Sequence, residues 1–536
     1  MTYGENGSVV GPQNLPTSSA ASGVWSMGEV AEASRDSLWP APFTGWMAQY
    51  APNVTRSGTP APSYNNVLLD LDTNNDIVLT ATAAHSSGNA GMFGKITSSG
   101  TLTSTHDYVL GSTSNVFRIC GLTVDTSNNI YIGGDWTSGG PYAGIWRAKL
   151  DSSLSEIWFN NRSDEAMRIT ANANTYSNSN YGLRASPNGN AVIDPAYGLY
   201  SSGYNQFTEP VRASDGYSLP WVSGSYKAYA NPSTSTNMGS STQAIGINNT
   251  NLLVMGRVYD SGYGGYINFL NSGGNTLGNQ PNRCYVSPRG GTNNSNYFGV
   301  SNAKGYKTAA NNNRYPWVSY VESGATIGSV NFTNCMAFQQ WNYASGWNLI
   351  DLQTQFFVNP ADSPMTPTNL WPDSMEWDST DTTLYILCRD NGSTPNQNYL
   401  IAYTPGTQTI EWQRKLVISK TGQGSSTTQS ASNNSLVIDS NDEFLHMAFH
   451  TTNSGLTSDK LLVMKLPVNG DGSGTWTVGD YTVVYEASNI TKVHESTLTA
   501  FFNAGSMYQH TATNYANDPG TATSTSMTGT LTEGSK

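Results

Sequence analysis

Short polar turns that lead into apolar strands recur along this chain. The clearest are the turn at Asp125, which precedes the apolar run from Ile130, and the turn at Asp439, which precedes the run from Phe444. Successive turns lie 53, 61, 62, 53, 77 and 61 residues apart, the length of one four-stranded unit with its loops. The seven turns begin at Asp72, Asp125, Ser186, Asn248, Ser301, Asp378 and Asp439.

Repetition at this spacing predicts a ring of small sheets. A four-stranded sheet has apolar faces that it cannot bury alone, and stacking such sheets around an axis buries both faces. We therefore predict an all-β fold: a seven-bladed β-propeller with a short N-terminal extension that contains one helix. The predicted divisions are a flexible arm at 1–21, a docking segment at 22–58, the propeller at 59–490, and a C-terminal strand-like piece with a low-complexity tail at 491–536.

The segment at 22–40 carries the one helix that the sequence predicts. Ser26 and Glu29 form a capping box, and Pro40 ends the segment. A helix of about ten residues is too short to be stable alone in water, so its apolar face must dock on a partner or on the propeller itself. The side chains that we expect to dock are Trp25, Val30, Leu38 and Trp39.

Composition supports the all-β prediction and narrows the function. Charged residues make up only 12% of the chain, about half the usual share, and Gly, Ser, Thr, Asn and Tyr are abundant. The net charge of −12 gives no basic patch for gripping nucleic acid. The first residues lack the apolar core of a signal peptide, and no run of 18 apolar residues is present to span a membrane. We expect assembly in the cytoplasm and release by lysis.

The four cysteines are Cys120, Cys284, Cys335 and Cys388, at successive spacings of 164, 51 and 53 positions. Their spacing fits neither a metal-binding pair nor a recognisable disulfide framework. We expect small buried thiols in a reducing compartment.

The second unit has a recognisable sequence. Asp125, the apolar-Tyr-apolar run around Tyr131, the Lys149-Leu-Asp151 run and the closing Trp158 together resemble the repeat of bacterial seven-bladed β-propeller proteins. The first and last units match in part, through Asp72 with Lys95 and Asp439 with Lys465, whereas units three to five lack the lysine. The resemblance implies the fold and little about chemistry.

A second resemblance lies near the N-terminus. Gly23-Val24-Trp25-Ser26, a short helix with Glu29, and Trp39-Pro40 are similar to a motif in structural proteins of tailed bacteriophages, including marine phages. The resemblance implies a virion protein of a tailed phage, such as a tail fibre, a tail-tip adhesin or a nozzle-type protein.

Propellers also host enzymes, so catalytic patterns matter. The run from Asp471 to Trp476 is a single near match to the repeated Asp box of sialidases, with Ser473 where a Gly is expected. The run from Ala402 to Trp412 resembles a quinoprotein blade turn, but no adjacent cysteine pair accompanies it. We interpret Trp412 as a residue that packs between blades, and we predict no catalytic residues and no cofactor.

Metal binding is the remaining chemistry that the sequence suggests. His446 and His450 lie four apart in an apparent strand, which separates them by about 13 Å, too far to hold one zinc ion. The turns at Asp72 and Asp439 alternate oxygen side chains as part of a calcium loop does, but lack its Gly and its bidentate Glu. We predict that these carboxylates stabilise turns, and we predict no metal site.

The function that we expect is host recognition by a non-enzymatic tail protein. Aromatic side chains in its loops would contact a host-surface glycan or protein. The alternative for these side chains is packing between blades. Its partners would be other tail proteins and further copies of the chain. The alternatives are a structural component of the tail tube or nozzle, and a glycan-degrading propeller enzyme. The candidate contact residues are Tyr259, Tyr263, Tyr266, Trp341, Tyr343 and Trp347.

Overall fold

The computed structural model places the chain as an all-β molecule. The predicted helix at 22–40 lies outside the residues that the structure describes. These residues are 45–52, 67–85, 88–109, 116–137, 143–163, 181–182, 184–185, 191–200, 203–216, 226–230, 237–248, 251–259, 263–271, 282–287, 299–305, 314–323, 326–327, 330–331, 335–343, 347–349, 355–358, 370–390, 397–420, 428–430, 435–452, 460–479, 481–494, 499–504, 508–512 and 531–533.

Two neighbouring four-stranded antiparallel sheets follow the sequence repeat most closely. In each, the first two strands are joined by the predicted Asp turn, at Asp72 or Asp125, and consecutive strands pair in order. The strands of the first sheet are β2 (Leu68–Leu71), β3 (Ile77–His85), β4 (Gly88–Ile96) and β5 (Leu102–Val109). Those of the second are β6 (Val116–Val124), β7 (Ile130–Thr137), β8 (Ala143–Leu150) and β9 (Glu156–Ser163).

Two sheets near the C-terminal end repeat this plan with additions. The first, after the Asp378 turn, has the order β26-β27-β28-β29-β35-β34. Its strands are β26 (Leu370–Trp377), β27 (Leu384–Asp390), β28 (Gln397–Thr404), β29 (Thr409–Lys420), β34 (Gly474–Val478) and β35 (Tyr481–Ala487). The second is built from β30 (Thr428–Ser430), β31 (Leu436–Ile438), β32 (Phe444–Thr452) and β33 (Lys460–Pro467).

The second of these sheets is completed from the other end of the chain. Strand β1 (Trp46–Pro52) pairs antiparallel with β33, with Trp46 opposite Lys465. The sequence interpretation continued the propeller through residue 490 in simple chain order and put residue 46 in the docking segment. In the structure, β34 and β35 instead extend the preceding sheet beyond β29. The N-terminal strand therefore joins the two ends of the strand series.

The central third of the chain forms further sheets, which are antiparallel except that β10 pairs parallel with β15. Ser301, one of the expected turn positions, lies inside β19, so the connection to β20 follows Gly305 instead. The strands are β10 (Tyr181–Gly182), β11 (Arg184–Ala185), β12 (Ala191–Tyr200), β13 (Gly203–Arg212), β14 (Tyr226–Ala230), β15 (Asn237–Asn248), β16 (Asn251–Tyr259), β17 (Tyr263–Asn271), β18 (Asn282–Ser287), β19 (Gly299–Gly305), β20 (Arg314–Ser323), β21 (Thr326–Ile327), β22 (Val330–Asn331), β23 (Cys335–Tyr343), β24 (Trp347–Leu349) and β25 (Gln355–Val358).

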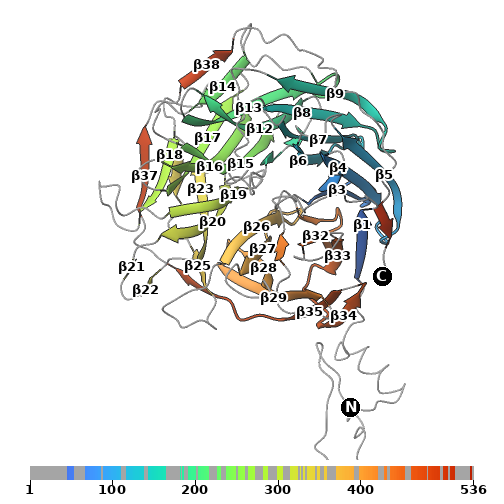
Figure 1. Ribbon diagram of the computed structural model, residues 1–536. Helices are drawn as coiled ribbons and strands as arrows, with labels where there is room; N and C mark the ends of the chain where they lie inside the picture. Colours follow the sequence, from blue (N-terminus) through green and yellow to red (C-terminus); the bar gives the residue numbers. More distant parts are fainter. Residues whose placement is uncertain are drawn as a thin grey trace, which may run out of the picture.

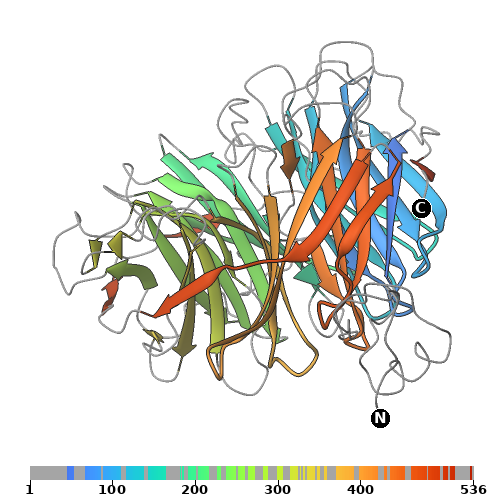
Figure 2. The same ribbon diagram turned by 90° about the horizontal axis from the view of Figure 1, so that it is seen from below.

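The sheets are arranged around a common centre, as in a β-propeller (Figure 1). Their inner strands contact one another from sheet to sheet: β2 contacts β6 and β31, and β26 contacts β31 and β19. Seen from below, the strands run from one face of the ring to the other (Figure 2). The connections between strands therefore gather on two opposite faces.

Apolar residues on both faces of each sheet explain this stacking. In β2 and β3, Leu69 and Leu79 pack against Val463 of the last sheet, whereas Leu68 and Val78 pack towards the sheet of β6. Because successive side chains of a strand point to opposite faces, a continuous apolar run serves two neighbours at once. Similar buried clusters join the β26 sheet to β32 and β33 on one side and to β23 on the other.

The end of the chain runs backwards around the outside of the ring. We call residues 474–533, which contain β34 to β39, the belt. β35 pairs with β29, β36 (Thr491–His494) with β25, β37 (Thr499–Ala504) with β18, and β38 (Tyr508–Ala512) with β14, all antiparallel. The last strand, β39 (Leu531–Glu533), pairs with β1. In Figure 1 the red strands of the belt lie on the outer rim.

Candidate functional site

The Asp turns hold their shape through their own carboxylates. Asp125 accepts hydrogen bonds at Oδ1 from the backbone amides of Ser127 (2.8 Å) and Asn129 (2.9 Å). Asp72 accepts equivalent bonds from Asn74 (2.8 Å) and Asp76 (2.9 Å). This confirms the interpretation of these carboxylates as turn-stabilising groups. In the turns at Asp378 and Asp439, which are one residue longer, the carboxylate accepts from the amides four and five residues further on.

A left-handed residue in each of three turns links neighbouring sheets. Asn128 has φ 63° and accepts a hydrogen bond at its Oδ1 from the amide of Thr73 in the adjoining sheet, at 2.9 Å. Asn75, with φ 60°, accepts in the same way from Ser440 at 3.0 Å. Asp442, with φ 56°, accepts from Ser379 at 2.9 Å. These bonds form one repeated joint along the face that carries the Asp turns, which we call the turn face.

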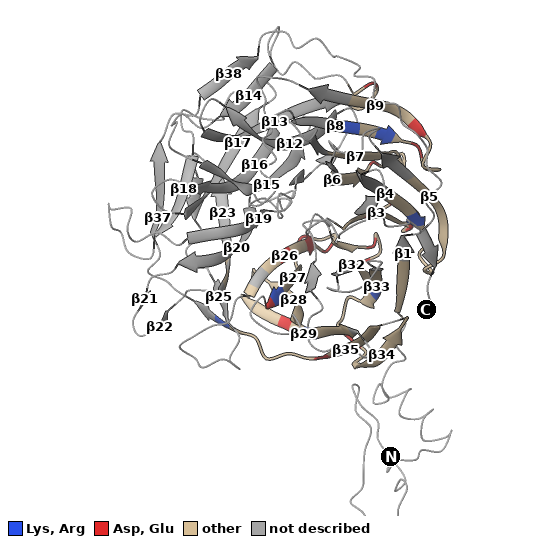
Figure 3. Ribbon diagram, viewed as in Figure 1, with Lys and Arg blue, Asp and Glu red and all other residues tan. Residues whose placement is uncertain are grey.

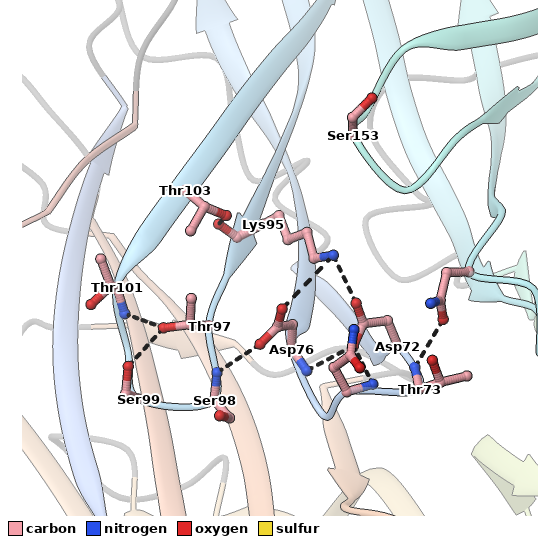
Figure 4. Close-up of polar contacts among 12 residues, drawn as sticks. Asp72, Thr73, Asp76, Lys95, Thr97, Ser98, Ser99, Thr101, Thr103 and Ser153 are labelled. Carbon is pink, nitrogen blue, oxygen red and sulfur yellow. Dashed lines mark hydrogen bonds and ion pairs between the residues drawn. The ribbon is translucent and has the colours of Figure 1, made fainter.

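Lys95 occupies the position beside the first Asp turn where a cation would be attracted. Its Nζ lies 2.7 Å from Asp72 Oδ2 and 3.8 Å from Asp76 Oδ2 (Figure 4). Asp76 also accepts a hydrogen bond at Oδ1 from the amide of Ser98, at 3.1 Å. The carboxylates are therefore engaged by a lysine and by backbone amides. Among the described residues, no group of three or more His, Cys, Asp or Glu side chains is placed to hold a metal ion.

A second repeated joint is built from a lysine and a tryptophan on adjacent strands. Trp46 Nε1 and Lys465 Nζ both donate to the carbonyl oxygen of Ser98 in the next sheet, at 2.9 and 3.3 Å. In the β6–β9 sheet, Trp158 Nε1 and Lys149 Nζ both donate to the carbonyl oxygen of Ala213, at 3.2 Å each. Lys149 and Lys465 of the recognised repeat therefore connect neighbouring sheets, whereas Lys95 pairs with the Asp turn of its own sheet.

A glycine gives each tryptophan room to pack. Gly100, Gly216 and Gly470 all have positive φ, and a Cβ built on any of them would meet the indole of Trp46, Trp158 or Trp412 at 3.1, 2.7 and 2.6 Å respectively. No side chain fits between the turn and the ring. Trp412 thus packs between sheets, as its sequence position suggested.

His446 is a fully buried histidine whose ring nitrogens have no hydrogen-bond partner. It lies on β32 between Val437 of β31 and Lys465 of β33. Burial, and then the charge of Lys465, lower the pKa of His446 to about 3. A cationic neighbour is unfavourable for a metal ion, so this histidine is better suited to a neutral place in the core.

Two tyrosines are also held neutral by their surroundings. Burial, followed by the charge of Asp125 and a 3.0 Å hydrogen bond from the phenol to Asp125 Oδ2, raises the pKa of Tyr131. Burial and then the charges of Asp378 and Asp442 raise the pKa of Tyr385 to about 12. Their hydroxyl groups therefore remain protonated at neutral pH.

One buried charged pair was missed by the sequence analysis. Asp373 lies at an irregularity of the inner strand β26, and its Oδ1 is 3.6 Å from Arg389 Nε of β27. A comparable irregularity falls at residue 120 of β6. The sequence signal for the pair is weak because no local motif connects an aspartate and an arginine sixteen residues apart.

The predicted contact residues do not form one surface. Tyr259 and Tyr263 face each other across the connection between the second and third strands of their sheet, and Tyr266 lies further along β17. Trp341, Tyr343 and Trp347 lie at the β23–β24 connection, which follows a third strand. Because antiparallel strands alternate in direction, the β16–β17 and β23–β24 connections belong to opposite faces of the ring. The β23–β24 connection belongs to the turn face. Trp25, Val30, Leu38 and Trp39 lie outside the described residues.

Charge is sparse over the described sheets (Figure 3). Lys95, Lys149, Lys465 and Arg414 all bond to groups of their own or neighbouring turns. These four basic side chains thus hold turns and sheets of the ring together.

Within the described ranges, the structure has no helix long and apolar enough to cross a membrane.

Comparisons with known proteins give a distant likeness in shape. No family model matches the chain, and no curated protein matches its sequence. Among solved structures, the polysaccharide lyase Uly1 is 8% identical over 78% of this chain and 92% of its own, with a TM-score of 0.42. The β-propeller domain of Cps50 (Swd1) from Myceliophteria thermophila is 8% identical over 77% of this chain and 99% of its own, with a TM-score of 0.33. Similarity this low says nothing about activity.

Proposed function

We propose that this chain is a structural protein of a tailed-phage virion, a seven-bladed propeller carried on the tail or a fibre that presents loops to a host-surface glycan or protein. In this proposal residues 1–45 attach the chain to other tail proteins. The ring faces remain available for host contact, and the chain works as a non-enzymatic adhesin in more than one copy.

The contacts between inner strands support the count of seven. Beginning at β2, they run through β6, β11, β15, β19, β26 and β31 and return to β2. Each of these strands belongs to a different sheet. The circuit agrees with the seven repeats in the sequence, four of which have the expected Asp at the first turn.

The observation that carries the proposal is the position of β1. Its five residues Trp46 to Tyr50 pair with β33, and its end pairs with β39, so β1 is held on both edges. Anything that binds residues N-terminal to Trp46 is therefore connected to the ring through a strand locked into a sheet. This arrangement suits an attachment arm, and it adds to the motif at 22–40 that resembles phage structural proteins.

Incorporation into particles tests the attachment role. The double variant Trp25→Ala with Trp39→Ala should fold with an unchanged melting temperature yet be lost from purified particles, as detected by an antibody against the ring. The matched control Trp341→Ala with Trp347→Ala should remain in the particles. Equal incorporation of both variants, or detection of the protein only in the soluble lysate, would overturn the proposal.

Binding to host cells tests the recognition role and the face that performs it. The purified protein should adsorb to host cells, and the two aromatic groups should separate in their effects. If the turn face carries the contact, Trp341→Ala with Trp347→Ala lowers adsorption and Tyr259→Ala with Tyr263→Ala does not. Adsorption that requires the intact particle would favour a tube or nozzle component, and release of soluble sugar would favour an enzyme.

A further inference from the structure

The belt moves from sheet to sheet in regular steps. Three residues separate β35 from β36, four separate β36 from β37, and three separate β37 from β38. β36 and β37 each pair with the outer strand of another sheet, in the reverse of chain order. β38 then pairs with β14, which contacts β13 of the sheet before. Adding a strand at an edge satisfies backbone groups that would otherwise be a template for pairing with another chain.

Two neighbouring four-stranded sheets have no described belt strand paired with their outer strand, although β39 contacts β5. These are the sheets that end in β5 and in β9, and β2 and β6 contact each other. They lie between β14, where β38 is bound, and β1, where β39 is bound (Figure 1). The belt therefore pairs with sheets on both sides of these two.

The length of chain between β38 and β39 fits the missing steps. Eighteen residues separate Ala512 from Leu531. Two further strands of about four residues, with three connections of about three residues each, need about seventeen residues on the belt's own pattern. The sequence also has a turn signal in the middle of this stretch, Asp518-Pro519-Gly520, which divides it into two parts.

The side chains of β9 and of the intervening stretch match this use. Ile157 on β9 is 50% exposed and is the one large apolar side chain that is exposed among the described residues. The part after Gly520 alternates Thr521, Thr523 and Thr525 with small residues and carries no charge up to Leu531. Threonine is favourable in strands, and an added strand over β9 would cover Ile157.

We propose that the outer edges of β9 and β5 are the docking surface for residues 513–530 of this same chain, the part before Pro519 on β9 and the part after Gly520 on β5. The belt then encloses the whole ring without interruption. A single chain thereby supplies every outer edge strand, and the two sheets are closed to strands of other molecules.

Disulfide trapping tests the docking. For β9, Ile157→Cys is combined in turn with cysteine at Asn514, Tyr515, Ala516 and Asn517. For β5, Thr103→Cys, at an exposed position, is combined in turn with cysteine at each residue from 521 to 526. Paired strands bring opposite residues within disulfide distance. We expect cross-links within one molecule, identified by mass spectrometry, that form at every second position. The control Ser153→Cys, in a turn beside β9, should form none with the same partners.

The other outcomes each overturn the proposal. Cross-links between molecules would assign the edge to a second copy, and an absence of cross-links at every position would leave the edge to an external partner. A second measurement avoids reliance on the variants. Replacing residues 513–530 by a Gly/Ser segment of the same length should speed amide hydrogen exchange in β9 and β5 by at least tenfold and leave β7 unchanged. Unchanged exchange in β9 and β5 would also contradict the docking.

Discussion

The sheets of β2 to β9 and the belt are built by different means. In the sheets, neighbouring strands are close in sequence, both faces are apolar, and side chains such as Lys149 and Asn128 join one sheet to the next. The belt instead consists of short strands that pair with the outer strands of sheets from much earlier in the sequence. The ring therefore provides most of the core, to which β34 and β35 of the belt add Val478, Tyr481, Val483 and Tyr485. The later belt strands pair with the outer strands of other sheets.

Buried positions in the core of the ring should be far more sensitive to substitution than exposed positions of the belt. Trp146 is fully buried between the sheets of β2 and β6, so Trp146→Ala should lower the free energy of unfolding by roughly 3–5 kcal/mol. Thr475 on β34 is exposed, and Thr475→Ala should change it by less than about 0.5 kcal/mol. Urea denaturation followed by circular dichroism measures both. Similar losses would remove the distinction between the buried ring position and the exposed belt position.

Acid should weaken the ring at the sheet that β1 completes. The pKa of His446 is about 3 in the fold and near 6.5 when unfolded, so the unfolded chain binds the extra proton between these values. The contribution of His446 to the free energy of unfolding is therefore fully present above pH 6.5 and decreases as the pH falls. At pH 4.5 the free energy of unfolding should be lower by roughly 3 kcal/mol.

Replacing the histidine separates its effect from that of the carboxylates. His446→Leu should lose most of the pH dependence between pH 6.5 and 4.5, measured by urea denaturation at each pH. His510→Gln, a change in the belt, serves as the control and should keep the dependence of the parent. If His446→Leu titrates as steeply as the parent protein, the acid sensitivity arises elsewhere.

The tryptophan joints should depend on their glycines. A Cβ at Gly470 would lie 2.6 Å from Trp412, and its φ is +71°, so Gly470→Ala should cost about 2 kcal/mol. Gly406 lies in the turn between β28 and β29, where a Cβ would meet no atom within 4 Å. Gly406→Ala should therefore be neutral or slightly stabilising. Melting temperatures of the two variants, compared with the parent, provide the check. An equal effect at both sites would count against tight packing at the joint.

The turn-to-turn hydrogen bonds should contribute the least. Asn128→Gly keeps the left-handed backbone and removes the acceptor for Thr73, which should cost about 1 kcal/mol. Asn128→Asp keeps an oxygen in place and should be close to neutral. Chemical denaturation measures the free energy of unfolding of both variants. An unchanged value for Asn128→Gly would show that the hydrogen bond does not stabilise the ring.

The parts of the fold that the sequence predicts are those with local causes. The turns at Asp72, Asp125, Asp378 and Asp439 could be predicted because the carboxylate, the left-handed residue and the strand that follows lie within a few residues. The polar turns also predict the strands, because alternating apolar runs begin beside them.

The missed features all depend on distant partners. Nothing near Trp46 indicates that β1 pairs with β33, and the belt strands are short, without a repeat of their own. The tail, which the sequence interpretation left as a strand-like piece and a low-complexity end, therefore supplies strands that only the sheet edges can specify. The lysines of the repeat were recognised, but the bonds of Lys149 and Lys465 to the next sheet depend on how the sheets are placed together.

The meeting of the two chain ends on one sheet is the direct test of this account. Ala51 of β1 and Thr532 of β39 are opposite each other in the ladder, so Ala51→Cys with Thr532→Cys should form a disulfide within a single molecule under mild oxidation. The control pair Ser153→Cys with Thr532→Cys should form none. A disulfide in the monomer is the result that we predict, and an absence of cross-linking, or cross-links between molecules alone, would contradict a ring closed by β1 and enclosed by its own C-terminal belt.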